Sequence, residues 1–169
     1  MKGSIERVLG ALNAADVRYV VVGGVAVVLH GYLRTTADLD LVIQLDSENV
    51  RRAIRALESI GYRSRLPVSA EQLADADARR SWIEDKGMVV FSLWSEHDPF
   101  LGVDLFVEEP FDFDAVHARA VRVRLERETI VVVAREDLIR LKEQAGRPRD
   151  VEDVTALRAL AEPPEESDG

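Results

Sequence analysis

Two aspartates, Asp38 and Asp40, open an apolar segment of the sequence that runs to Ile43. Residues two apart on a strand share one face, so this spacing predicts two carboxylates about 6.5 to 7 Å apart. Leu39 and Leu41 would point the other way, into the core. Carboxylates on one face repel each other, and a divalent cation would offset that repulsion. An isolated Asp-x-Asp is also typical of an ordinary solvated strand start, so other residues must decide.

A third aspartate, Asp104, interrupts a second apolar segment, Gly102 to Val107. A charged group inside such a segment is costly unless it is paired or bound to a metal. We therefore predict that Asp104 lies on a neighbouring strand and completes a cluster of three carboxylates. The alternative is a strand-end aspartate held by a nearby arginine or a backbone amide.

The composition restricts which metal this cluster could hold. The chain has no cysteine and only three histidines, which excludes thiolate sites and argues against a histidine-rich zinc site. Carboxylate oxygens suit hard cations, so the sequence predicts Mg²⁺, with Mn²⁺ as the second choice.

A glycine pair, Gly23-Gly24, follows a buried strand-like segment and precedes an apolar helical one. Glycines there let the backbone approach a ligand, and a helix N-terminus offers free N–H groups to phosphate. The surrounding residues form neither a GxGxxG motif nor a P-loop. The alternative interpretation is a simple turn.

Several helices and strands would have to position these residues. The patterns predict an α/β or α+β fold, a sheet with helices mainly on one side and two C-terminal helices. Residues 1–162 are expected to form one domain, and residues 163–169 a disordered acidic tail. The expected helices are 4–15, 25–31, 48–60 with Ser47 as a cap, a short one after Ser69, 135–145 and 151–160; the expected strands are 18–22, 39–45, 88–94, 102–107, 121–125 and 129–133.

The chain of 169 residues carries a formal net charge of −9, which argues against non-specific nucleic-acid binding by a broad basic surface. Its sequence contains neither a stretch typical of a membrane span nor an N-terminal signal peptide, so we expect a cytoplasmic protein without a membrane partner.

Taken together, the motifs resemble the polymerase-β-like nucleotidyltransferase superfamily, which implies a mixed sheet flanked by helices. The three pieces are Val22-Gly23-Gly24, Asp38-Leu39-Asp40 and Val103-Asp104-Leu105, in that order. Gly24 stands where many members carry serine, which leaves backbone N–H groups to bind phosphate.

Within that superfamily the chain looks most like the small bacterial AbiEii-type toxin nucleotidyltransferases. Two stretches carry this likeness: Arg34-x-Thr36-x-Asp38-Leu39-Asp40, and Asp137-Leu138-Ile139-x-Leu141-Lys142 followed by Gly146-Arg147-Pro148-Arg149-Asp150-x-x-Asp153. The likeness implies the toxin of a toxin–antitoxin system, with an antitoxin as partner.

The resemblance implies transfer of a nucleoside monophosphate from an NTP to an acceptor hydroxyl, with two divalent cations. Asp38 and Asp40 would ligate both ions, and Asp104 would ligate one and accept the hydroxyl proton. The glycine pair would hold the triphosphate, and Arg34 and Lys142 would neutralise its charge. The alternatives are that Arg34 pairs with a carboxylate and that Lys142 is a solvated helix lysine.

The sequence leaves the acceptor open among a tRNA end, a protein side chain, an antibiotic and a metabolite. Two other functional interpretations remain. One is a catalytically silent member of the fold that binds nucleotide or a partner. The other is a Mg²⁺-dependent phosphohydrolase, although the motif context of its nucleophilic aspartate is missing.

Overall fold

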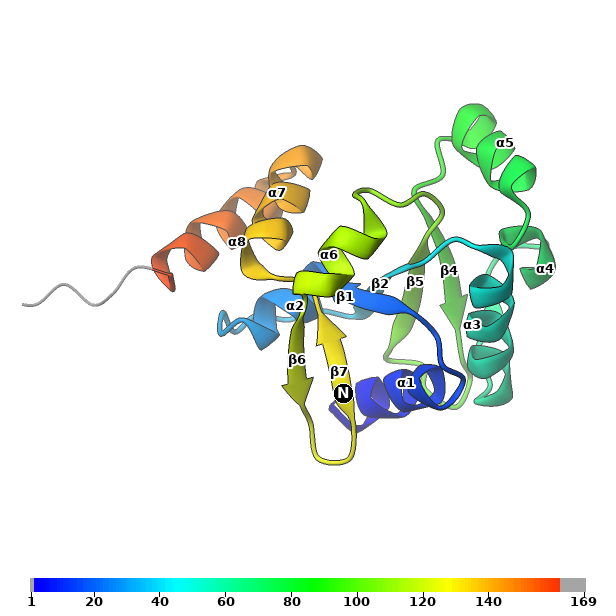
Figure 1. Ribbon diagram of the computed structural model, residues 1–169, viewed down its shortest axis with the longest axis horizontal. Coiled ribbons are helices and arrows are strands. Elements are labelled where there is room, and N and C mark those ends of the chain that lie inside the picture. Colours follow the sequence, from blue (N-terminus) through cyan, green and yellow to red (C-terminus); the bar gives the residue numbers. More distant parts are fainter. Residues whose placement is uncertain (1, 162–169) are drawn as a thin grey trace, which may run out of the picture.

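A computed structural model describes residues 2–161 of the chain (Figure 1). Seven strands form one sheet in the order β3-β4-β5-β2-β1-β7-β6. The strands are β1 (Tyr19–Val22), β2 (Asp38–Ile43), β3 (Arg63–Ser64), β4 (Val90–Trp94), β5 (Gly102–Phe106), β6 (Val121–Arg124) and β7 (Thr129–Val132). The helices are α1 (Lys2–Ala14), α2 (Gly23–Leu29), α3 (Ser47–Ser59), α4 (Ala70–Leu73), α5 (Ala76–Lys86), α6 (Phe113–Arg119), α7 (Arg135–Ala145) and α8 (Pro148–Ala159).

The sheet is mixed, as the sequence predicted. Strand β2 pairs with β1 antiparallel and with β5 parallel, and β1 pairs with β7 parallel. The remaining neighbours pair antiparallel, including β6 and β7, which form a hairpin from the two strands predicted at 121–125 and 129–133. The predicted acidic tail lies outside the described residues.

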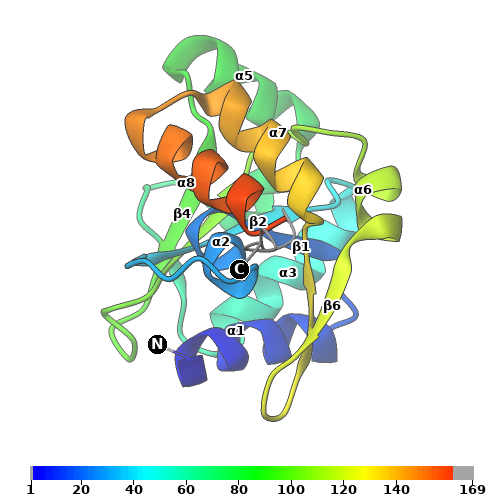
Figure 2. The same ribbon diagram turned by 90° about the vertical axis from the view of Figure 1, so that its left-hand side faces the viewer.

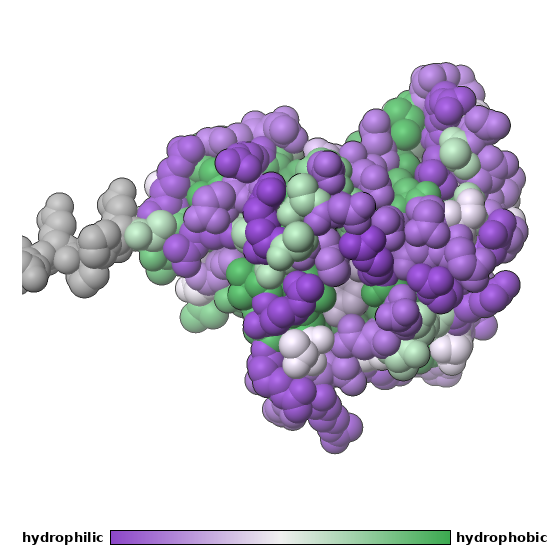
Figure 3. All heavy atoms as spheres, viewed as in Figure 1, coloured by the Kyte–Doolittle hydropathy of each residue, from purple (hydrophilic) through white to green (hydrophobic). Residues whose placement is uncertain are grey.

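Helices cover both sides of the sheet, so the expectation that they lie mainly on one side is wrong. Figure 2 shows α1 and α3 below the sheet and α5, α7 and α8 above it. The face seen in Figure 3 is mostly hydrophilic, and α5 projects from its upper right. None of the helices within residues 2–161 has the length and apolar character needed to cross a membrane.

The two central strands show why the sequence forms this sheet. All four residues of β1 are buried, as expected for a strand covered on both faces. On β2, Leu39 and Leu41 are fully buried while Asp38 is exposed and Asp40 is half-buried. This alternation confirms the prediction that the leucines enter the core and the aspartates share the other face.

Some helix boundaries differ from the sequence prediction. Helix α2 begins at Gly23 rather than at Val25, so the glycine pair forms the first turn of the helix. Asp46, not Ser47, caps α3, because its side chain accepts a hydrogen bond from Asn49 N at 3.0 Å. The sequence analysis missed β3, α5 and α6.

Asn49 joins β2, which carries Asp38 and Asp40, to β1, which leads into the glycine pair. Its side chain accepts a hydrogen bond from Arg18 N (2.8 Å) and donates to Arg18 O (3.0 Å) and Gln44 O (2.9 Å). It therefore ties the start of β1 to the end of β2, and it is completely buried. Buried backbone groups that lose such partners cost free energy.

We predict that Asn49→Ala lowers the free energy of unfolding by about 2 to 3 kcal/mol, because backbone groups of Arg18 and Gln44 lose their partners. Urea denaturation measures the change. As a control, Thr155→Ala removes an exposed hydroxyl that bonds to Val151 O in its own helix, and should change stability by less than about 0.5 kcal/mol. Equal stability of Asn49→Ala and the wild type would show that this contact is dispensable.

Candidate active site

Strand pairing brings the three predicted carboxylates to one face of the sheet. Asp40 lies opposite Asp104 in the parallel pair of β2 and β5, and Asp38 lies opposite Gly102. Partners in register point to the same side, so all three side chains rise from the face that Leu39 and Leu41 leave free. The sequence could predict the faces, but only the pairing shows that β5 is the neighbour of β2.

Two glycines make room for these carboxylates. A Cβ atom at Gly23 would collide with the carboxylate of Asp40, and one at Gly102 would collide with the carboxylate of Asp38. Gly23 also has φ +63°, in the left-handed region that favours glycine. Asp40 and Asp38 therefore lean toward different neighbours, the end of β1 and the start of β5.

Burial and mutual repulsion raise the pKa values of Asp40 and Asp104. Burial, helped by the charges of Asp104 and Asp38, raises the pKa of Asp40 to about 6, against a hydrogen bond from the backbone of Gly24 and the charge of Lys142. Burial also raises the pKa of Asp104, opposed by a hydrogen bond from Ser92. The sequence analysis missed Ser92, which lies opposite Asp104 on β4.

The donor set fits a hard divalent cation, but the carboxylates do not yet converge. Within residues 2–161, no three acidic or histidine side chains are already gathered closely enough to form a preformed metal site. The carboxylate of Asp38 lies against Gly102 and that of Asp40 against Gly23, so the two point to different neighbours. Rotation about their side-chain bonds would be needed for Asp38, Asp40 and Asp104 to share an ion.

The glycine pair lies directly beside the carboxylates. The position that a Cβ of Gly24 would take is 2.6 Å from Thr36 Oγ1 and 2.9 Å from Arg34 Nη2. A side chain there would displace both residues, so glycine is required for this close approach. The loop before β2 is thus packed against the first turn of α2.

Lys142 is buried rather than solvated, with 6% of its surface exposed. Its ammonium contacts Asp150 at 3.0 Å and Asp153 at 2.7 Å, and its charge reaches Asp40. Arg34 likewise contacts Asp153, at 2.9 Å from Nε and 3.0 Å from Nη2. The structure thus places both predicted phosphate-binding cations near the cluster, held by carboxylates of α8.

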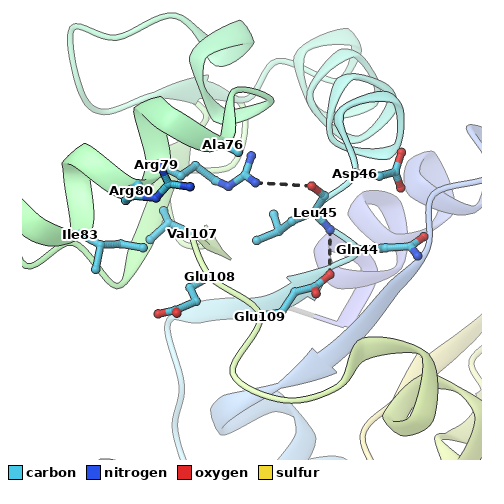
Figure 4. A pocket seen from close by; sticks show the side chains of 10 residues that line it. All are labelled: Gln44, Leu45, Asp46, Ala76, Arg79, Arg80, Ile83, Val107, Glu108 and Glu109. Atoms are coloured by element: carbon cyan, nitrogen blue, oxygen red, sulfur yellow. Dashed lines mark hydrogen bonds between the residues drawn. The ribbon is translucent and has the colours of Figure 1, made fainter.

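A cavity of about 560 Å³ lies away from this cluster, between α5 and the ends of β2 and β5 (Figure 4). Arg79 of α5 donates to Leu73 O at 2.7 Å and reaches Leu45 O at 3.5 Å, while Glu109 accepts from Leu45 N at 3.0 Å. Burial lowers the pKa of Arg79. These contacts attach α5 to the sheet, and none of the seven predicted site residues, all within the described part of the chain, lines the cavity.

Residues 4–162 match the family described as nucleotidyltransferase of unknown function (DUF6036). The chain belongs to this family. The match covers nearly all of the described residues, including the carboxylate cluster and the α7–α8 pair. No curated protein matches the sequence of this chain.

Several solved structures share the fold of this protein. The lincosamide antibiotic adenylyltransferase LnuA, bound to lincomycin, has a TM-score of 0.64 at 16% identity, over 95% of this chain and 98% of its own. ANT(2″)-Ia bound to adenylyl-2″-tobramycin has a TM-score of 0.61 at 14% identity, over 95% and 89% of the two chains. An antigenic nucleotidyltransferase-like protein from Paracoccidioides brasiliensis has 0.53 at 18% identity, over 94% and 75%. The likeness confirms the nucleotidyltransferase fold; nothing in it separates the AbiEii-type group from others.

We predict that the Asp40→Asn variant has a higher free energy of unfolding than the wild-type protein at about pH 7.5 without divalent cations, by at most about 3 kcal/mol. The folded protein binds a proton at Asp40 more tightly than the unfolded chain does. Wild-type stability is therefore lost as the pH rises from about 4 to about 6. Urea denaturation with EDTA across this range measures the difference, which should vanish below about pH 4.

Asp137→Asn provides the control of opposite sign. Hydrogen bonding from Arg119 lowers the pKa of Asp137, so its charge stabilises the folded state above the ordinary pKa and this contribution is lost as the pH falls. This variant should be less stable than the wild type at neutral pH. If Asp40→Asn lowered stability at neutral pH, as Asp137→Asn should, the raised pKa assigned to Asp40 would be wrong.

Proposed function

We propose that this protein transfers a nucleoside monophosphate from an NTP to a hydroxyl group of an acceptor. The observation that carries the proposal is the pairing of Asp40 with Asp104 across β2 and β5, with Asp38 on the same face and Gly23-Gly24 beside it. Membership in a nucleotidyltransferase family supports it.

In the proposed reaction, the acceptor oxygen forms a bond to the α-phosphorus while the bond from that phosphorus to the bridging oxygen breaks, and pyrophosphate leaves. Asp38, Asp40 and Asp104 would hold Mg²⁺, or Mn²⁺ in its place, and two such ions would stabilise the attacking and leaving oxygens. Asp104 would accept the proton of the hydroxyl. Its raised pKa favours that role, since it makes the carboxylate a stronger base.

The residues beside the carboxylates would hold the triphosphate. Backbone N–H groups at Gly23 and Gly24 lie in the first turn of α2, where the helix dipole favours negative charge. Gly24 N–H now bonds to Asp40, so a phosphate oxygen would have to replace that carboxylate. Arg34 and Lys142 would add positive charge to the same region.

The acceptor is proposed to be a small molecule with a hydroxyl group. LnuA is an antibiotic adenylyltransferase of nearly the same extent as this chain, and ANT(2″)-Ia binds an adenylylated antibiotic. The toxin role implied by the AbiEii-type resemblance, with its antitoxin and a tRNA or protein acceptor, stays a prediction from the motifs. A silent nucleotide-binding protein is the alternative that the first experiment must exclude.

The deciding experiment incubates the protein with Mg²⁺, each α-labelled NTP and a cell extract, and measures pyrophosphate release and the labelled fraction. Pyrophosphate together with a labelled small-molecule fraction is the expected result. Label in RNA or in protein would support nucleotidyl transfer but would show that the acceptor is RNA or protein and not a small molecule. NTP binding without pyrophosphate would identify the silent alternative, and orthophosphate alone would identify a phosphohydrolase.

We predict that Asp38→Asn and Asp40→Asn each weaken Mg²⁺-dependent NTP binding by about tenfold or more while the fold is retained. Each change removes one charged ligand at nearly constant shape. Isothermal titration with and without Mg²⁺ measures the affinity, and circular dichroism measures the fold. Asp85→Asn, an exposed carboxylate on α5, is the control that should bind as the wild type does.

Asp104→Asn should separate chemistry from binding. We expect NTP binding within a few-fold of the wild type, because Asp38 and Asp40 remain. Transfer should be at least about 100-fold slower, because the proposed proton acceptor is lost. Rapid-quench turnover measurements test this. A stable Asp104→Asn protein with wild-type turnover would remove Asp104 from the mechanism.

A further inference from the structure

One buried carboxylate, Asp153 of α8, contacts both cations of the proposed triphosphate site. Its Oδ2 lies 2.7 Å from Lys142 Nζ and accepts a hydrogen bond from Arg34 Nη2 at 3.0 Å. Its Oδ1 lies 2.9 Å from Arg34 Nε. With only 1% of its surface exposed, Asp153 lies behind the two cations, away from solvent.

The two cations come from different parts of the chain. Arg34 belongs to the loop before β2, and its guanidinium borders the first turn of α2 at Gly24. Lys142 belongs to α7, and its charge lowers the pKa of Asp40. Asp153 is therefore the point at which α8 links the glycine turn to the metal-binding face.

The inner charges of this cluster balance. Arg34 and Lys142 contribute two positive charges, and Asp150 and Asp153 contribute two negative ones; Arg147, whose side chain is 77% exposed, adds a third positive charge at the surface. Buried ion pairs rarely stabilise a fold more than apolar contacts of the same volume would. Two cations held together beside three carboxylates instead suit an anionic ligand, whose phosphates would lie between the two groups.

We propose that Asp153 is a positioning residue, which orients Arg34 and Lys142 together toward the triphosphate without touching it. This inference rests on the proposed function, because it assumes that an NTP binds beside Gly23 and Gly24. The two cations then act as one unit, since Asp153 is the carboxylate that they share, although Asp150 also contacts Lys142.

The test compares Asp153→Asn with Asp137→Asn in the full chain. Asp137 is a second buried carboxylate, held by Arg119 and Arg140 rather than by the site cations. Isothermal titration uses whichever of ATP, GTP, CTP and UTP the wild type binds best, with Mg²⁺. We expect Asp153→Asn to raise the Kd by about tenfold and Asp137→Asn to leave it unchanged, although both lower the melting temperature. Equal weakening by both variants would overturn the proposal, because a merely structural role predicts it.

A double-mutant cycle tests whether Asp153 acts through its two partners. In a protein that already carries Arg34→Met and Lys142→Met, Asp153→Asn should change the Kd by less than about twofold. A full effect in that background would overturn the proposal. If Asp153→Asn does not fold, Arg34→Lys replaces it, because this variant keeps the charge but not both contacts with Asp153. An Arg34→Lys protein with wild-type affinity for the NTP would overturn the proposal.

The two proposals fail in different ways. A wild-type protein that binds none of the four NTPs would overturn the proposed function and this inference with it. A wild-type protein that binds and transfers, beside an Asp153→Asn variant with unchanged affinity, would overturn the positioning role alone.

Discussion

The register between β2 and β5 is the constraint on which the rest of the site depends. Leu39 and Leu41 are fully buried on one face, and a slip of one residue would send them to the other face and the aspartates into the core. The burial of these leucines on one face of the sheet thus fixes the position of the carboxylates, which repel one another on the other face. Asp40 and Asp104 lie opposite each other although their own interaction opposes that arrangement.

Charge is arranged in two groups around the first turn of α2. The carboxylates of β2 and β5 form the negative group, and the cations held by α8 form the positive one. Asp40 belongs to both, since its own group raises its pKa while Lys142 lowers it. Proteins tolerate local conflicts of this kind mainly where function requires them, and the rest of the fold supplies the stability.

The strands of the central sheet and the faces of their aspartates could be predicted because these signals are local. Alternation along β2 and the lone charge in β5 can both be read from a few neighbouring residues. The missed features depend on tertiary contacts: helix α5 buries only Arg79 and Trp82, so its apolar periodicity is weak. The burial of Lys142 had a signal, because it follows the buried Leu138 by four residues and shares its helix face.

The contact between Arg34 and Asp153 spans 119 residues of sequence. During synthesis the loop before β2 leaves the ribosome long before α8 does, so the loop and Lys142 must wait for their shared carboxylate. The order of the chain therefore sets a time at which the site can be completed. A nascent chain interrupted before α8 contains β1, β2 and β5, yet it lacks the element that gathers its cations.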